Sequence, residues 1–178
     1  NWYVSTFKTI DILINNAALM ALPTRKESHF GVEMQMATNH YGHFYLTHLL
    51  LPLLKKSTPS RIINVASIAH YTNSSWDWDN LNQEKSYDPW LAYGNTKLAN
   101  IYFTQELLRR LSGSQIKTVC LQPGVVRTEL LLPYFSEHKL LKNLQLLAWP
   151  FWWYFTKNSE QGAQTTLHCA LCDFDKLE

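Results

Sequence analysis

Ile10-Asp11-Ile12-Leu13-Ile14 is a short apolar run that ends at Asn15-Asn16, a pattern typical of a β-strand buried on both faces. The segments from Arg61 to Ala66 and from Lys117 to Leu121 have the same apolar character. We therefore expect three short strands, each followed by polar or turn-forming residues.

Two helical stretches separate these strands. Apolar residues recur at helical spacing from about Gly31 to Leu54 and again from about Trp90 to Leu111. Strands that alternate with helices predict an α/β fold with a parallel, doubly wound sheet. In such a sheet, ligands bind in the crevice beyond the carboxyl ends of the strands. Asn16, Ser67 and Pro123 follow the three strands directly, so we expect them to converge on one edge.

The composition of the chain limits the kinds of partner that it can bind. The chain has 178 residues and 46% hydrophobic content, which suits one domain with a buried core. A formal net charge of +2 is too small to indicate a nucleic-acid partner. The three cysteines are an odd number without framework spacing, so free thiols are expected. His40 and His43 lack a third ligand at workable spacing, and we expect no metal site.

A proton-transfer site is indicated by Tyr93-Gly94-Asn95-Thr96-Lys97. Four residues are about one helical turn, so the lysine ammonium would lie beside the phenol and hold it partly ionised. Ser67 could then hydrogen-bond a substrate oxygen. Reduction of a carbonyl by a nicotinamide needs such a proton donor, and Tyr93 is the candidate.

The order and content of these motifs closely resemble the short-chain dehydrogenase/reductase family, and within it the retinol dehydrogenase-like branch. The resemblance implies a Rossmann-type sheet and a catalytic triad of Ser67, Tyr93 and Lys97. It also implies Asn39, in the segment Thr38–Phe44, as a fourth member that helps to hold a water linked to the lysine. From its pattern alone, Asn39 is a polar residue inside a helix, and a purely structural role is an equal alternative.

The same resemblance implies a cofactor, NADP or NAD. Asn16-Ala17 is similar to the family's element beside the cofactor, although Ala18 stands where the family has glycine. The segment from Pro123 to Thr128 resembles the one that contacts the nicotinamide carboxamide; from residues alone it is a strand-to-helix turn. The implied cofactor-binding residues are Asn16, Ala17, Tyr93, Lys97, Pro123, Gly124, Val126 and Thr128.

No Gly-rich turn precedes Asp11, whereas the family begins with a strand, such a turn and a helix that bind the pyrophosphate. We therefore expect residues 1–178 to form a single partial NAD(P)-binding domain, the C-terminal part of the Rossmann-type sheet. If the chain is complete as given, the strand at Ile10–Ile14 would be an exposed apolar edge. The residue that selects NADP or NAD would lie in the segment that precedes Asp11 in the family.

The segment Leu140–Phe155 is apolar and aromatic but is interrupted by Lys142 and Pro150. A buried helix pair, the lid of a substrate pocket and a peripheral membrane contact all fit this pattern. The chain shows no run of about 18 apolar residues. We expect the protein in the cytoplasm or on the cytoplasmic face of the endoplasmic reticulum membrane, and a homo-oligomer is compatible with the family.

Two functions compete. The first is an oxidoreductase acting on a small hydrophobic alcohol or carbonyl compound, retinoid-like or steroid-like. The second is a truncated, catalytically inactive binding or interaction module that keeps the same residues. Dinucleotide binding and turnover separate the two.

Overall fold

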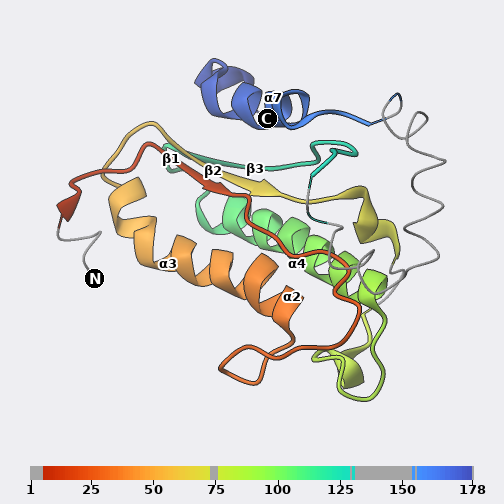
Figure 1. The fold of residues 1–178 in the computed structure, drawn as a ribbon. Helices are drawn as coiled ribbons and strands as arrows, with labels where there is room; N and C mark the ends of the chain where they lie inside the picture. The colour runs from red at the N-terminus through yellow and green to blue at the C-terminus, as the bar shows by residue number, and fades with distance from the viewer. Residues whose placement is uncertain (1–5, 73–75, 129, 131–153, 155, 178) are drawn as a thin grey trace.

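The computed structural model of the chain describes residues 6–72, 76–128, 130, 154 and 156–177 (Figure 1). Its centre is a three-stranded parallel sheet in the order β1-β2-β3. The strands are β1 (Ile12–Asn15), β2 (Ser60–Val65) and β3 (Ile116–Leu121), where the apolar runs predicted them.

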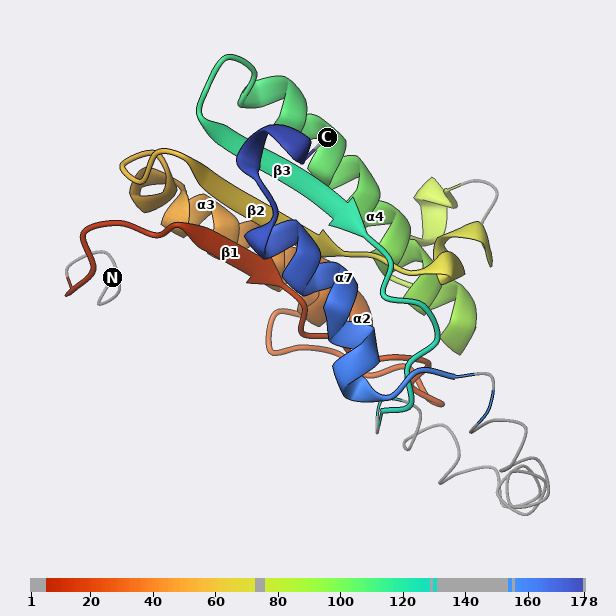
Figure 2. The ribbon, with the colours of Figure 1, turned by 90° about the horizontal axis from the view of Figure 1, so that it is seen from above.

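Helices cover both faces of this sheet, as a doubly wound fold requires. The long helices α3 (Gly42–Leu54) and α4 (Pro89–Arg110) lie on one face, and α7 (Ser159–Leu171) lies on the other over β2 and β3 (Figures 1 and 2). Short 3-10 turns occur at Ile68–Thr72, Trp78–Asn80 and Phe174–Lys176. The predicted α/β, parallel fold class is confirmed.

The first helical stretch begins later than its apolar pattern predicted. Gly31 has a left-handed φ of +73°, and the helix starts only after Glu33, whose carboxylate accepts the N–H groups of Gln35 and Met36. The short helix α2 (Met34–Met36) then continues through a π-helical segment, Ala37–Tyr41, into α3. Single π-helical turns of this kind occur frequently at functional sites.

Two hydrophobic clusters hold the layers together. The cluster between the sheet and the pair α3 and α4 consists of Leu13, Leu50, Leu53, Leu54, Ile62, Phe103, Leu107, Leu111 and Ile116. The cluster beneath α7 consists of Ile63, Val65, Val119, Leu121, Ala170 and Leu177. Because successive strand residues point to opposite faces, Ile62 and Ile63 contribute to different clusters.

The prediction that the first strand is buried on both faces is wrong for β1. Leu13 and Asn15 are buried against the helical layer, but Ile12 is 37% exposed and Ile14 is 41% exposed on the opposite face. The cause is the position of α7, whose main contacts with the sheet are with β2 and β3. In the described part of the chain, β1 is therefore an edge strand with one apolar face uncovered.

A buried polar chain fixes the ends of the first two strands. The Asn15 side-chain amide donates to Thr47 Oγ1 at 3.0 Å and to Asn64 Oδ1 at 2.8 Å, and Asn64 Nδ2 donates to Thr104 Oγ1 at 2.9 Å. These bonds tie β1 to β2, α3 and α4 at the end of the sheet from which the candidate site residues project. Breaking one would leave buried polar groups unpaired, which is costly.

Candidate active site

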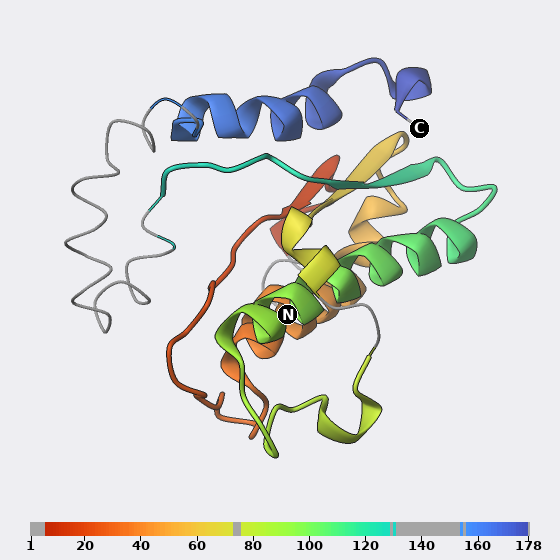
Figure 3. The ribbon, with the colours of Figure 1, turned by 90° about the vertical axis from the view of Figure 1, so that its right-hand side faces the viewer.

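A cavity of about 800 Å³ lies at the carboxyl ends of the three strands. The segment after β3 passes between α7 and α4 there (Figure 3). Nearly all of the residues predicted for catalysis or cofactor binding line it: Asn16, Ser67, Tyr93, Lys97, Pro123, Gly124, Val126 and Thr128. Asn39 and Ala17 do not line it. The predicted convergence of Asn16, Ser67 and Pro123 on one edge is confirmed.

Tyr93 projects from the first turns of α4, which begin where the sequence predicted. The Asp88 carboxylate caps this end by accepting the Leu91 N–H at 2.7 Å, and Pro89 occupies the first helical position. Tyr93 is only 5% exposed, and burial raises the pKa of its phenol because the phenolate would lose solvation. A hydrogen bond from the Ser67 side chain opposes part of this rise.

The direction of that shift corrects one expectation. We expected Lys97 to lower the pKa of Tyr93 and hold the phenol partly ionised. In the structure the pKa of Tyr93 is raised, because desolvation outweighs the stabilisation of the phenolate by Ser67. The resting side chain at neutral pH is therefore a neutral phenol.

Lys97 is held beneath the cavity by the sheet. Its Nζ atom donates to the Val65 carbonyl at 3.0 Å and lies 5.5 Å from the centroid of the Tyr93 ring. The side chain is 2% exposed, and burial lowers the pKa of Lys97 to about 8, while the nearby Cys120 thiol opposes this change. Lys97 thus titrates close to the physiological range.

Asn39 lies within the π-helical segment, and its side chain is fully used by protein groups. Its Oδ1 atom accepts the Leu19 N–H at 2.7 Å, while Nδ2 donates to the Leu19 carbonyl at 2.8 Å and to Thr96 Oγ1 at 3.1 Å. The amide therefore fastens the segment after β1 to α4. Asn39 is fully buried and reaches the site through these neighbours.

Gly94 was not predicted to matter, yet it allows α4 to approach the Ser67 segment. A Cβ atom at this position would lie 2.5 Å from the Ala69 carbonyl oxygen and would overlap the Thr72 hydroxyl. The close approach brings Ser67, at the start of this turn, next to Tyr93. An isolated glycine inside a helical pattern is the signal that could have identified this contact.

The loop after β3 is clamped by the start of α7. Gly124 has a left-handed φ of +87°, Lys157 Nζ donates to the Pro123 carbonyl at 3.0 Å, and the Lys157 backbone pairs with Val125 and Arg127. α7 begins with a capping box in which Asn158 and Gln161 exchange hydrogen bonds.

Sequence reasoning missed the contribution of α7 to the cavity wall, although the spacing of Asn158 and Gln161 is a readable helix-start signal. Gly162 lies so close to Val126 that a Cβ atom there would be 2.6 Å from a Val126 methyl group. The lining residues that were not predicted include Met20, Ile68, Trp90, Val125, Leu130, Ser159, Ala163, Thr166 and Leu167.

Ala18, which stands where the family has glycine, also lines the cavity and has no left-handed backbone in the structure. Its methyl group therefore causes no backbone strain.

The predicted absence of a metal site concerned His40 and His43. Burial lowers the pKa of both rings; Lys97 adds to the shift at His43, and a hydrogen bond to Asn100 opposes it at His40. Within the described ranges, no group of three or more His, Cys, Asp or Glu side chains is placed to bind a metal ion.

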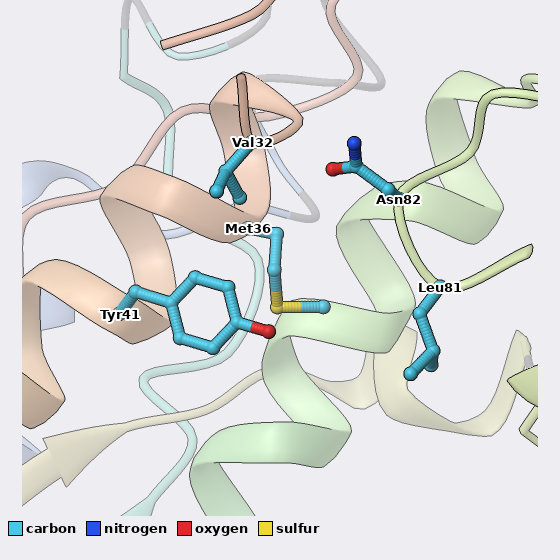
Figure 4. Close-up of a pocket in the computed structure, with 5 residues that line it drawn as sticks. All are labelled: Val32, Met36, Tyr41, Leu81 and Asn82. Carbon is cyan, nitrogen blue, oxygen red and sulfur yellow. The ribbon is translucent and has the colours of Figure 1, made fainter. Parts of the chain in front are cut away.

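A second, smaller cavity of about 200 Å³ is lined by Val32, Met36, Tyr41, Leu81 and Asn82 (Figure 4). It contains none of the predicted site residues. The segment Leu140–Phe155 lies outside the described residues except for Tyr154. Among the helices that are described, none combines the length and apolar content needed to cross a bilayer.

The parallel sheet and the Ser67, Tyr93 and Lys97 cluster at its carboxyl edge define a class of protein. The chain belongs to the short-chain dehydrogenase family, because the family model described as short chain dehydrogenase matches residues 1–139. Within this class, retinol dehydrogenase 11 of Homo sapiens is 45% identical over 174 residues, covering 96% of this chain and 51% of the relative. Retinol dehydrogenase 12 of Homo sapiens is 42% identical over 171 residues, with the same coverage of 96% and 51%. The resemblance to the retinol dehydrogenase-like branch is thus confirmed.

A solved structure shares the fold of this chain. An uncharacterized protein from Mycobacterium paratuberculosis has a TM-score of 0.70 and 34% identity, with coverage of 97% of this chain and 54% of that chain. The chain spans about half the length of the curated relatives it matches.

Proposed function

We propose that the protein is a nicotinamide-dependent oxidoreductase that interconverts a hydrophobic alcohol and its carbonyl compound. The observation that carries the proposal is that Ser67, Tyr93 and Lys97 line one cavity at the strand ends, with Lys97 Nζ 5.5 Å from the Tyr93 ring centroid. Membership of the short chain dehydrogenase family supports the reaction class.

Tyr93 is the proposed acid and base. In reduction its phenol gives a proton to the carbonyl oxygen, and in oxidation it takes the proton of the alcohol. The raised pKa of Tyr93 keeps the phenol neutral near pH 7, which is the form that reduction needs. Ser67 donates a hydrogen bond that stabilises either the phenolate or the substrate oxygen. Lys97 supplies the nearby positive charge while it is protonated.

A nicotinamide cofactor, NAD or NADP, would supply or accept the hydride when bound. The residues proposed to bind it are Asn16, Ala17, Pro123, Gly124, Val126 and Thr128 after the strand ends, together with Tyr93 and Lys97 on α4. Two features of the cavity support the fit. Gly124 has no side chain and lines the cavity, and Asn16 is exposed just after β1.

The apolar wall of the cavity supports a hydrophobic substrate. Ile68 follows Ser67 directly, Trp90 lies one helical turn before Tyr93, and Leu167 faces the cavity from α7. An alcohol with a bulky apolar body would bury that body here while its oxygen lies near the two hydroxyls. The names of the relatives, retinol dehydrogenases, agree with such a substrate.

Asn39 is proposed as a positioning residue of the same site. Its side chain fixes Leu19 and Thr96, and the Thr96 hydroxyl in turn donates to the Tyr93 carbonyl at 2.7 Å. Loss of the Asn39 amide would therefore disturb both the segment after β1 and the turn of α4 that presents Tyr93.

The test is turnover of a hydrophobic aldehyde such as retinaldehyde by the native polypeptide, with NADPH and with NADH, compared with Tyr93→Phe. We expect Tyr93→Phe to lower kcat by about 10²- to 10⁴-fold while dinucleotide binding changes little. Equal turnover by the variant would remove Tyr93 from the acid role. Binding of dinucleotide without turnover by the native protein would instead favour a catalytically inactive binding module.

A further inference from the structure

Asn100 is a buried amide that the proposed reaction does not yet use. It lies on α4 three residues after Lys97 and is 1% exposed. Residues three apart on a helix face the same side, so Asn100 points toward the same layer as Lys97. Its side chain contacts three groups on two other elements, the π-helical segment Ala37–Tyr41 and β2.

The donor end of this amide holds two backbone carbonyls. Asn100 Nδ2 donates to the Asn39 carbonyl at 3.0 Å and lies 3.5 Å from the Val65 carbonyl oxygen. Val65 is the last residue of β2, and its carbonyl also accepts the Lys97 ammonium at 3.0 Å. Asn100 and Lys97 therefore share one acceptor at the end of the strand that leads to Ser67.

The acceptor end of the amide fixes its orientation. Asn100 Oδ1 lies 3.0 Å from His40 Nδ1, and burial keeps the pKa of His40 below its usual value, so the ring is neutral at pH 7. A neutral ring with its proton on Nδ1 donates to Oδ1, which leaves both amide hydrogens for the carbonyls. This set of partners requires a carboxamide, because a carboxylate could not donate and a hydroxyl could not reach all three.

We propose that Asn100 is a positioning residue for the Ser67, Tyr93 and Lys97 site: it holds the Val65 carbonyl that binds Lys97 and joins this anchor to the π-helical segment that carries Asn39. The inference rests on the proposed function. It assigns Asn100 no contact with substrate, and its effect on the reaction passes through the place and the charge of Lys97.

The pKa of Lys97 is the quantity by which the inference can be tested. The groups that face Lys97 are Tyr93 on its own helix, Cys120 on β3 and His43 on α3; His40 faces Asn100. None of these carries a negative charge at neutral pH in the native protein. A carboxylate at position 100 would place a negative charge beside the Lys97 ammonium and raise the pKa of Lys97.

The experiment compares Asn100→Asp with the native polypeptide and with Gln105→Glu, a matched amide-to-acid change at an exposed position of α4. The pKa of Lys97 is followed by NMR titration of lysines labelled with ¹³C at Cε, and its signal is assigned by its loss in Lys97→Met. We expect Asn100→Asp to raise the pKa of Lys97 by about one unit or more and Gln105→Glu to leave it unchanged. An unchanged pKa in a folded Asn100→Asp protein would overturn the inference.

Kinetics provide a second readout on the same variants. In a plot of kcat against pH, kcat should fall on the alkaline side as Lys97 loses its proton. Asn100→Asp should move this alkaline limb to higher pH. A rate that falls by the same factor at every pH, with no shift of the alkaline limb, would contradict the inference. If Asn100→Asp does not fold, Asn100→Ser serves instead: we expect kcat to fall about tenfold with little change in KM, whereas native kinetics would contradict the inference.

Lack of turnover in the native protein would count against the proposed function alone, because the NMR titration does not depend on activity.

Discussion

Gly94 packs against the backbone of Ala69 so closely that a Cβ atom at position 94 would lie 2.5 Å from the Ala69 carbonyl oxygen. This contact is the reason that the turn beginning just after Ser67 can dock on the helix that carries Tyr93. It makes the geometry of the site sensitive to a single methyl group.

The first prediction concerns this contact. Gly94→Ala should destabilise the protein by about 1–3 kcal/mol through overpacking, although glycine to alanine inside a helix otherwise stabilises by about 1 kcal/mol. The free energy of unfolding from urea denaturation measures the change. Gly42→Ala is the control, since its new Cβ would meet one carbonyl oxygen at 3.3 Å, and we expect a smaller loss there. An equal or greater stability of Gly94→Ala would show that the Ser67 turn can move aside freely.

The second prediction concerns the buried charge of Lys97. Folding lowers its pKa from 10.5 to about 8, so between these values the unfolded chain binds more protons than the folded chain. The burial of Lys97 therefore costs stability at neutral pH, and this cost disappears as the pH rises from about 8 toward 10.5.

Lys97→Met should accordingly raise the free energy of unfolding at pH 7 by about 1–3 kcal/mol while abolishing turnover. The gain over the native protein should shrink when unfolding is measured at pH 9.5. Lys117→Met offers a comparison, because it makes the same change of side chain at a half-buried lysine on β3. A gain that is the same at both pH values would contradict the assigned pKa direction.

The third prediction concerns the clamp on the loop after β3. Gly162→Ala would place a Cβ atom 2.6 Å from a Val126 methyl group, so α7 or the loop from Pro123 to Thr128 must shift. We expect dinucleotide affinity to fall about tenfold or more, measured by fluorescence titration with NADPH and NADH. Gln164→Ala, an exposed change on the same helix, should leave affinity unchanged. Native affinity in Gly162→Ala would remove this loop from the binding site.

Much of the site could be predicted from the strand pattern because its residues are tied to the ends of strands. Asn16, Ser67 and Pro123 follow apolar runs, and the topology of a parallel sheet brings such positions to one edge. Tyr93 and Lys97 followed from helical spacing. These inferences depend on local sequence and on one rule of topology, and the structure places all five residues at one cavity.

Other features depend on contacts that no local pattern reveals. Ile12 and Ile14 have the apolar character of a strand buried on both faces, but whether a second face is covered depends on where α7 packs, and α7 is far away in the sequence. The pKa direction of Tyr93 depends on how strongly the phenol is buried, which spacing to Lys97 does not report. The hydrogen-bond partners of the Asn39 amide could not be predicted either, because they lie on two other segments of the chain.

The most direct test of the central claim is the transfer of deuterium to retinaldehyde by the native polypeptide from NADPH or NADH that carries deuterium at both C4 positions, read by mass spectrometry of the alcohol. The account predicts one deuterium in the alcohol formed by the native protein and almost no labelled alcohol formed by Tyr93→Phe in the same time. Dinucleotide that binds without any transfer of label, or transfer that proceeds equally well in Tyr93→Phe, would contradict the assignment of this cavity as the active site of an oxidoreductase.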